Sequence, residues 1–167
     1  MRRYNLRVQQ ALPEATVYLL NWALEKVTGF GTARSLYNFI SPDKHLAGKT
    51  GTTDDYRDSW FAGYGADKVA VIWVGRDDNK PTGLSGAAGA LQVWARLARD
   101  LDMRGIEDEM PQTIETALID PDTGLRADDG CQNPVEMPYA RGYAPQEYAP
   151  CADQHFGPLN WFKEIFR

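Results

Sequence analysis

The chain has 167 residues, 43% of them hydrophobic and 25% charged, with a formal net charge of −5. This composition is typical of a globular protein with enough apolar residues for a core. Because no stretch concentrates lysine and arginine, nucleic acid is excluded as an expected partner. No apolar run reaches the roughly 18 residues that a membrane span needs.

The first residues, Met1–Arg3, have the basic character of a signal peptide. Polar residues follow them, and Asn21 interrupts the apolar residues 17–20, so no hydrophobic segment of usual length forms. We therefore expect no signal peptide. Residues 4–8 alternate polar and apolar side chains, which predicts an edge strand.

A helix is predicted to begin near Pro13 and Glu14, which are favourable in a first turn. Apolar residues at helical spacing define its expected buried face: Val17, Leu20, Leu24 and Val27, widened by Leu19 and Trp22. The helix is expected to end at Thr28-Gly29, and a short second helix to open at Gly31-Thr32 and run to Tyr37.

After a turn at Ser41–Lys44, three segments have the composition of β-strands: residues 45–53, 58–64 and 69–75. Residues 65–68 have a hairpin sequence. The run Val69–Val74 is nearly all apolar, which predicts a central strand covered on both faces. A final amphipathic helix is predicted by helical spacing of Leu91, Trp94, Leu97, Ala98 and Leu101. This order predicts an α+β fold, an antiparallel sheet flanked by helices.

The composition changes after residue 103. We expect an acidic linker at 104–117 and a small extension at 118–167, with two short strands around the turn Pro121–Gly124. Residues 161–166 predict a short amphipathic helix that packs on the domain, and membrane contact is the alternative.

Two features of this extension suggest ligands or cross-links. Asp120 and Asp122 have the alternate spacing of a calcium loop, but no glutamate stands at the closing position, which disfavours that interpretation. Cys131 and Cys151 lack the spacing of a zinc site, and a disulfide is favoured over free thiols. The disulfide would close a loop and stabilise the folded chain by about 3 kcal/mol through chain entropy. A disulfide requires an oxidising compartment, yet we expect no export signal in this sequence. A missing N-terminal part of the protein would resolve the conflict.

The chemically informative motif is Lys49-Thr50-Gly51, a signature of serine acyl-transfer sites when it lies on a strand. A tripeptide alone is weak evidence, and a coincidental match on a surface strand is the structural alternative. Its context is stronger, because the motif stands between Leu46-Ala47-Gly48 and Thr52-Thr53.

Four segments together carry a family resemblance: Gly31–Arg34, Leu46–Thr53, Asp58–Tyr64 and Trp73–Asp77. They resemble the C-terminal half of the transpeptidase domain of class A penicillin-binding proteins, which are bifunctional peptidoglycan synthases. The resemblance covers residues 10–101 and implies that residues 1–103 are half of such a domain. The cysteine-paired tail is similar, less specifically, to the extension of these proteins.

The resemblance implies a substrate-binding strand made of Lys49, Thr50, Gly51, Thr52 and Thr53. The family uses it to hold the carboxylate of a D-Ala-D-Ala stem peptide or a β-lactam, which are the expected partners. Lys49 and Thr52 are also expected to be catalytic, Lys49 through its charge and Thr52 through an oxyanion-hole N–H. A strand edge admits a substrate chain, and Gly51 leaves it room. No cofactor is expected.

The family's nucleophile, in a Ser-x-x-Lys motif, and its Ser-x-Asn motif are not recognised here. The one Ser-x-x-Lys, Ser41–Lys44, lies on a proline-containing turn too close to Lys49 to face it across a cleft. A Ser-His-Asp set using Ser59 or Ser85 with His45 has no supporting spacing. We therefore expect the chain to be inactive alone and to need the missing N-terminal part of the same synthase.

The parent enzyme is expected in the periplasm, anchored in the inner membrane by a segment absent from this sequence. A non-catalytic module that docks on a cell-wall synthase is the main alternative, and a β-lactamase relative is disfavoured because it needs the same serine. Structural roles are expected for Asp58 at a turn and for Trp60, Phe61 and Trp73 in the core or the cleft wall. Arg76 and Asp77 are expected to pair.

Overall fold

The computed structural model describes residues 9–152, so the strand predicted at 4–8 and the helix predicted at 161–166 lie outside the described residues. The chain divides into a larger unit, Leu20–Glu109, and a smaller unit that combines Met1–Leu19 with Met110–Arg167. Within residues 9–152, no helix is long and apolar enough to cross a membrane.

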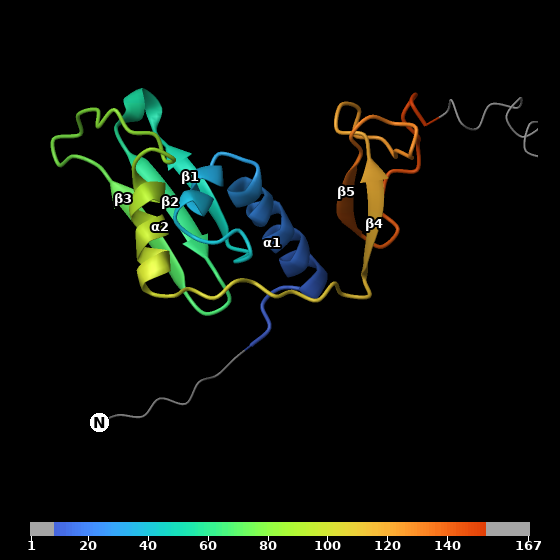
Figure 1. The fold of residues 1–167 in the computed structure, drawn as a ribbon, viewed down its shortest axis with the longest axis horizontal. Helices are drawn as coiled ribbons and strands as arrows, with labels where there is room; N and C mark the ends of the chain where they lie inside the picture. The colour runs from blue at the N-terminus through green and yellow to red at the C-terminus, as the bar shows by residue number, and fades with distance from the viewer. Residues whose placement is uncertain (1–8, 153–167) are drawn as a thin grey trace, which may run out of the picture. The chain divides into compact units, whose positions relative to one another are not determined.

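The larger unit contains a three-stranded antiparallel sheet of order β1-β2-β3 (Figure 1). The strands are β1 (Ala47–Thr52), β2 (Ser59–Tyr64) and β3 (Val69–Val74). The Gly65 N–H donates to the Lys68 carbonyl at 3.0 Å and closes the predicted hairpin between β2 and β3. The three predicted strands of this sheet are confirmed.

Helix α2 (Ala90–Asp100) lies across β2 and β3 in Figure 1 and covers one face of the sheet. The Trp94 ring meets the Phe61 ring edge-on, with centroids 5.1 Å apart. The Trp94 indole N–H donates to the Ala70 carbonyl at 2.9 Å. Gly63 leaves the space for these rings, because an added Cβ would lie 2.8 Å from Trp94. The predicted amphipathic helix is confirmed.

The prediction that β3 is a central strand covered on both faces is wrong for the described part of the chain. β3 is an outer strand, and on its face away from α2 the side chains of Val69, Val71 and Trp73 are 74%, 57% and 47% exposed. The neighbouring Trp60 of β2 is 42% exposed on the same face. An apolar run fits a strand with two covered faces and also a strand with one open face, so composition alone could not decide.

Helix α1 (Glu14–Gly29) begins and ends where the sequence predicts, and its predicted apolar face is confirmed in part, since Val27 packs half-buried against the core. Its buried residues are Asn21 and Thr28, whereas Val17 and Leu20 are 39% and 49% exposed. The Thr28 hydroxyl donates to the Leu46 carbonyl at 2.6 Å. Polar side chains with specific partners therefore hold this part of α1, and hydrophobic spacing does not detect them.

The short helix predicted after α1 is a 3₁₀ helix, η1 (Arg34–Asn38), which buries Leu36. A second 3₁₀ helix, η2 (Asp54–Tyr56), lies between β1 and β2 and was not predicted. The predicted turn is closed by the Lys44 N–H, which donates to the Ser41 carbonyl at 3.1 Å.

The smaller unit contains a second antiparallel sheet, in which β4 (Ile114–Ile119) pairs with β5 (Val135–Ala140). β4 provides the strand predicted before the Pro121–Gly124 turn. The prediction of a strand after that turn is wrong, because the described structure has only isolated bridges there, formed by Arg126. β5 was missed because its Pro138 is unfavourable within a strand.

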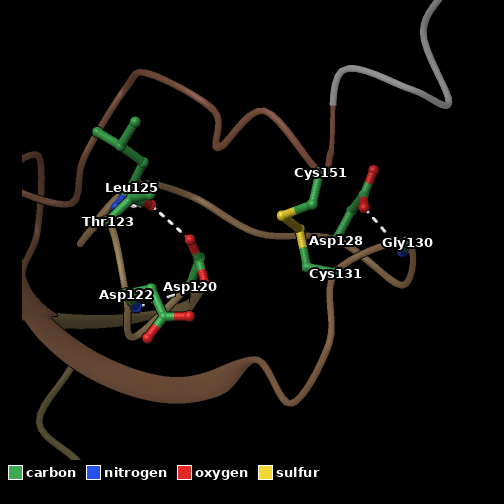
Figure 2. Close-up of a disulfide and its surroundings, with 8 residues drawn as sticks. All are labelled: Asp120, Asp122, Thr123, Leu125, Asp128, Gly130, Cys131 and Cys151. Carbon is green, nitrogen blue, oxygen red and sulfur yellow. Dashed lines mark hydrogen bonds between the residues drawn. A yellow bond between two sulfur atoms is a disulfide. The ribbon is translucent and has the colours of Figure 1, made fainter.

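Figure 2 shows the turn that follows β4 and the disulfide near it. The Thr123 hydroxyl donates to the Asp120 carboxylate at 2.6 Å, and the Gly124 N–H donates to the Asp120 carbonyl at 2.8 Å. Asp120 therefore closes the turn, and the described residues contain no metal-binding group of three or more side chains. The predicted disulfide between Cys131 and Cys151 is confirmed, with a Cα–Cα distance of 5.0 Å.

The disulfide should stabilise the smaller unit selectively. The buried residues packed around it are three alanines, which supply little apolar area: Ala127, Ala149 and Ala152. Replacing both cysteines by serine is expected to lower the opening free energy of β4 and β5 by about 3 kcal/mol, because the 20-residue loop is released. Native-state hydrogen exchange measures this strand by strand. Equal loss of protection in β1–β3 would contradict the selective role.

A pH dependence is expected in the larger unit. Burial raises the pKa of Glu25 above its ordinary 4.5, and the Asp108 carboxylate adds to the increase, against the effect of its His45 partner. The folded chain thus keeps a proton that the unfolded chain releases. The stabilisation is present below pH 4.5 and is lost as pH rises through the higher folded pKa.

Glu25→Gln removes this titration and should flatten that part of the pH profile. Hydrogen exchange of β2 amides, measured from below pH 4.5 upward in both proteins, follows the difference in opening free energy. Parallel profiles for the two proteins would show that Glu25 does not cause the dependence.

Candidate functional site

Strand β1 carries the Lys-Thr-Gly motif and is an outer strand, so one edge is unpaired among residues 9–152. At the start of the β1–β2 hairpin, the Thr53 N–H donates inward to the Asp58 carbonyl at 3.2 Å. Backbone direction alternates along an antiparallel pair, so Thr50 and Thr52 direct their N–H and C=O groups to the free edge. This edge can accept an extended chain.

Charge and hydroxyl groups meet at this free edge. Thr50 lies opposite Phe61, on the sheet face that α2 covers, whereas Lys49 lies opposite Ala62 on the open face. The Lys49 ammonium reaches back to the edge and donates to the Thr50 carbonyl at 2.9 Å. A cation therefore lies beside the outward-facing backbone, as an anionic ligand requires.

The Thr52 hydroxyl is held by the loop before α2. The Gly86 N–H donates to Thr52 Oγ1 at 2.8 Å. A backbone N–H can only donate, so Thr52 Oγ1 accepts and its own hydrogen stays free for a ligand. Only glycine allows this approach, because an added Cβ at residue 86 would lie 2.6 Å from the Gly51 carbonyl oxygen and 2.7 Å from that of Trp60.

The Thr50 hydroxyl has a different partner. Thr50 Oγ1 lies 2.7 Å from Thr32 Oγ1, in the segment between α1 and η1. Two other segments of the chain therefore contact the threonine hydroxyls: the Thr32 hydroxyl contacts Thr50, and the Gly86 N–H contacts Thr52.

Thr53, the remaining threonine of the predicted strand site, is committed to a turn. Its hydroxyl oxygen accepts from the Asp58 N–H at 2.8 Å, and the hydroxyl donates to the Asp58 carboxylate at 3.1 Å. The same carboxylate accepts from the Trp73 indole N–H at 2.9 Å. The structural role expected of Asp58 is therefore present, and Thr53 shares it.

The serines and the histidine considered as a catalytic set do not come together. Ser59 is fully buried and donates to the Ser85 carbonyl at 2.8 Å, while His45 Nδ1 lies 3.2 Å from Glu25. Ser41 is exposed, and the Lys44 ammonium binds Asp102 at 2.6 Å. Neither arrangement provides a serine with an adjacent base.

The expected pair between Arg76 and Asp77 is wrong. Arg76 binds Asp78 through two hydrogen bonds of 2.9 and 3.0 Å. The hydrogen bonds from Arg76 and Lys80 lower the pKa of Asp78 to about 2. These exposed groups stabilise the turn after β3 and lie outside the strand site.

The structure brings together Lys49, Thr50 and Thr52 of the predicted site, and Gly51 lies between the two threonines. Sequence reasoning missed the supporting residues Thr32 and Gly86. The sequence places Gly31-Thr32 at the start of a helix and in a segment of the family resemblance, without a role at the strand, and it assigns no role to Gly86. Their placement depends on tertiary packing.

Comparison with known proteins shows what the chain is similar to. No family model matches the chain. The crystal structure of penicillin-binding protein 1A from Haemophilus influenzae is similar, with a TM-score of 0.63 and 29% identity over 78% of this chain and 20% of that one. Most of the chain is therefore homologous to class A penicillin-binding proteins.

Similar sequences include penicillin-binding protein 1B from several bacteria. The protein from Vibrio cholerae is 37% identical over 162 residues, which are 96% of this chain and 20% of the relative. That from Escherichia coli is 38% identical over 116 residues, 70% of this chain and 14% of the relative. The chain thus spans a fifth or less of the length of these relatives.

Gly86 offers a direct test of the packing behind β1. Gly86→Ala should lower the unfolding free energy of the larger unit by about 1–3 kcal/mol, because its Cβ has no space. Gly29→Ala is the matched control, since no atom lies within 4 Å of the added Cβ. Urea denaturation measures both. A Gly86→Ala protein as stable as the control would contradict the close approach.

Proposed function

We propose that this chain forms the carboxylate-binding wall of the D,D-transpeptidase site of a class A penicillin-binding protein, a peptidoglycan synthase. One observation carries the proposal: the free edge of β1 combines the Lys49 ammonium with the outward-facing Thr50 and Thr52. Homology over most of the chain supports it. The ligand is the terminal carboxylate of a D-Ala-D-Ala stem peptide, or the carboxylate of a β-lactam.

The proposed roles follow from donor chemistry. A carboxylate only accepts hydrogen bonds, and hydroxyls and an ammonium donate them. Thr50 and Thr52 donate to the carboxylate, and Lys49 adds positive charge. The Thr52 N–H, which points to the free edge, serves as one oxyanion-hole donor for the reacting carbonyl. Gly51 keeps side-chain atoms away from the substrate backbone.

The reaction of the parent enzyme is acyl transfer through serine. The serine oxygen attacks the carbonyl carbon between the two D-Ala residues, the peptide bond breaks, and the terminal D-Ala leaves with a proton. An amine of a neighbouring stem peptide then attacks the serine ester, forms the cross-link and frees the serine. That serine is not among the described or predicted site residues, so we propose that another part of the synthase supplies it.

The open face of the larger unit is where we propose that part packs. It carries exposed apolar side chains, and the outer edge of β3 adjoins it: Trp60, Val69, Val71 and Trp73. Exposed apolar patches of this kind mark surfaces that another chain or segment covers. The occupant we propose is the N-terminal part of the same synthase, including its serine-bearing helix. In this proposal residues 1–103 are half of the transpeptidase domain, 104–117 a linker and 118–167 an extension.

A second candidate is a non-catalytic module that docks on a cell-wall synthase, and the same apolar face favours it. The two candidates differ in whether the docked complex reacts with penicillin. The Cys131–Cys151 disulfide supports a periplasmic location for either, because disulfides persist in oxidising compartments. We propose that the parent is anchored in the inner membrane by a segment outside this sequence, and that no cofactor takes part.

Fluorescent penicillin distinguishes these possibilities. The isolated chain is expected to form no covalent adduct. Co-expression with the remaining part of Vibrio cholerae penicillin-binding protein 1B should restore labelling, with the adduct on the serine of that part. Lys49→Ala should then reduce labelling at least roughly tenfold, because a charge-assisted contact is lost. Lys80→Ala is the matched control, since Lys80 pairs with Asp78 in another turn.

The outcomes separate the two candidates. Labelling of a serine in the isolated chain overturns the predicted inactivity. Stable binding to the complementary part without labelling supports the docking module and contradicts the transpeptidase proposal.

A further inference from the structure

We propose that Thr32 is a positioning residue of the β1 edge, whose hydroxyl orients the Thr50 hydroxyl towards a bound carboxylate. This inference rests on the proposed function of β1. Its basis is the hydrogen bond of 2.7 Å between Thr32 Oγ1 and Thr50 Oγ1, which links the end of α1 to the motif strand.

The backbone after α1 folds back tightly enough to bring Thr32 to the strand. The Gly31 N–H donates to the Lys26 carbonyl at 3.0 Å, and the Ala33 N–H donates to the Val27 carbonyl at 3.1 Å. Glycine is required at 31, because an added Cβ would lie 2.9 Å from the Val27 Cα. The next residue after Thr32, Ala33, is fully buried. Thr32 is therefore fixed by its backbone on both sides although it is itself exposed.

The hydroxyl pair has two possible directions, and a carboxylate selects one of them. Either Thr32 donates to Thr50 or Thr50 donates to Thr32. If Thr50 is to donate to a carboxylate, its oxygen must accept from Thr32, because a hydroxyl has only one hydrogen. The resulting chain of donors runs from Thr32 through Thr50 to the ligand, and each bond polarises the next.

Thr52 supplies an independent precedent within the same site. Its oxygen accepts from the Gly86 N–H at 2.8 Å, which leaves its hydrogen for the ligand. With Thr32 as donor, Thr50 reaches the same state. The two threonines then present hydrogens to one carboxylate in the same sense, before the ligand arrives, and this lowers the cost of ordering them on binding.

A purely structural role predicts a different pattern of effects. The bond between Thr32 and Thr50 is exposed, so its loss should change the unfolding free energy little. Its loss should instead lower the affinity for ligands that carry the carboxylate. This difference allows the positioning role to be tested separately from folding.

The test uses full-length Vibrio cholerae penicillin-binding protein 1B in which this chain replaces the homologous 162-residue segment. Acylation is measured with benzylpenicillin and with its methyl ester, which lacks the carboxylate charge. Thr32→Val keeps the shape and removes the hydroxyl, Thr32→Ser keeps the hydroxyl, and Thr16→Val is an exposed-threonine control on α1. Thermal unfolding of each variant checks that it folds.

Thr32→Val is expected to reduce the second-order rate constant of acylation by benzylpenicillin roughly 3- to 10-fold, the value of one hydrogen bond. The loss should lie in ligand affinity, because the reacting groups are unchanged. Thr32→Ser should recover most of the rate, and the methyl ester should react equally with both. In a Thr50→Val background, Thr32→Val should have no further effect.

Several results would overturn the inference: an unchanged rate in Thr32→Val, an equal loss with acid and ester, or a Thr32→Ser protein as slow as Thr32→Val. A folded but unsubstituted chimera that is never acylated contradicts the proposed function itself, and this inference falls with it.

Discussion

The single register in which β1 pairs with β2 is the constraint on which the candidate site depends. Side chains alternate along a strand, so a shift by one residue would exchange the faces of Lys49 and Thr50. Two glycines fix the register: Gly48 lies opposite Gly63, and an added Cβ on Gly48 would lie 2.5 Å from the Phe61 ring. Only a glycine pair fits beneath the packed rings, so β1 pairs with β2 in one register.

Two loops then contact the threonine hydroxyls of this strand edge. One follows α1 and carries Thr32, and the other precedes α2 and carries Gly86. A glycine is required in each loop: Gly31 lets the first loop fold back against Val27 of α1, and Gly86 lies directly against β1. The hydroxyl oxygens that they engage belong to neighbouring positions on one strand face. With Thr32 as the donor to Thr50, as we propose, both threonines direct their hydrogens to an anion without the cost of reorienting.

The two units of the chain are stabilised in different ways. The larger unit has a core of aromatic and aliphatic side chains, including the fully buried Phe61 and Trp94, and leaves one sheet face open. The smaller unit has small clusters rich in alanine and a disulfide. Apolar burial therefore holds the first unit, and a covalent cross-link compensates for limited burial in the second. We propose that the remaining part of a synthase covers this open face; the relatives extend far beyond the matched segment.

The sequence by itself determined the three strands of the larger unit, including the motif strand, the helices α1 and α2 and the disulfide, because these depend on local spacing and composition. It did not determine which side chains anchor α1, since Asn21 and Thr28 act through partners distant in the chain. It also could not show that β3 has an open face, because an apolar run has the same pattern in either setting. The contacts that Thr32 and Gly86 make with β1 were decided by tertiary structure alone. They join residues 18 and 34 positions apart, and only packing of the intervening elements brings such residues together.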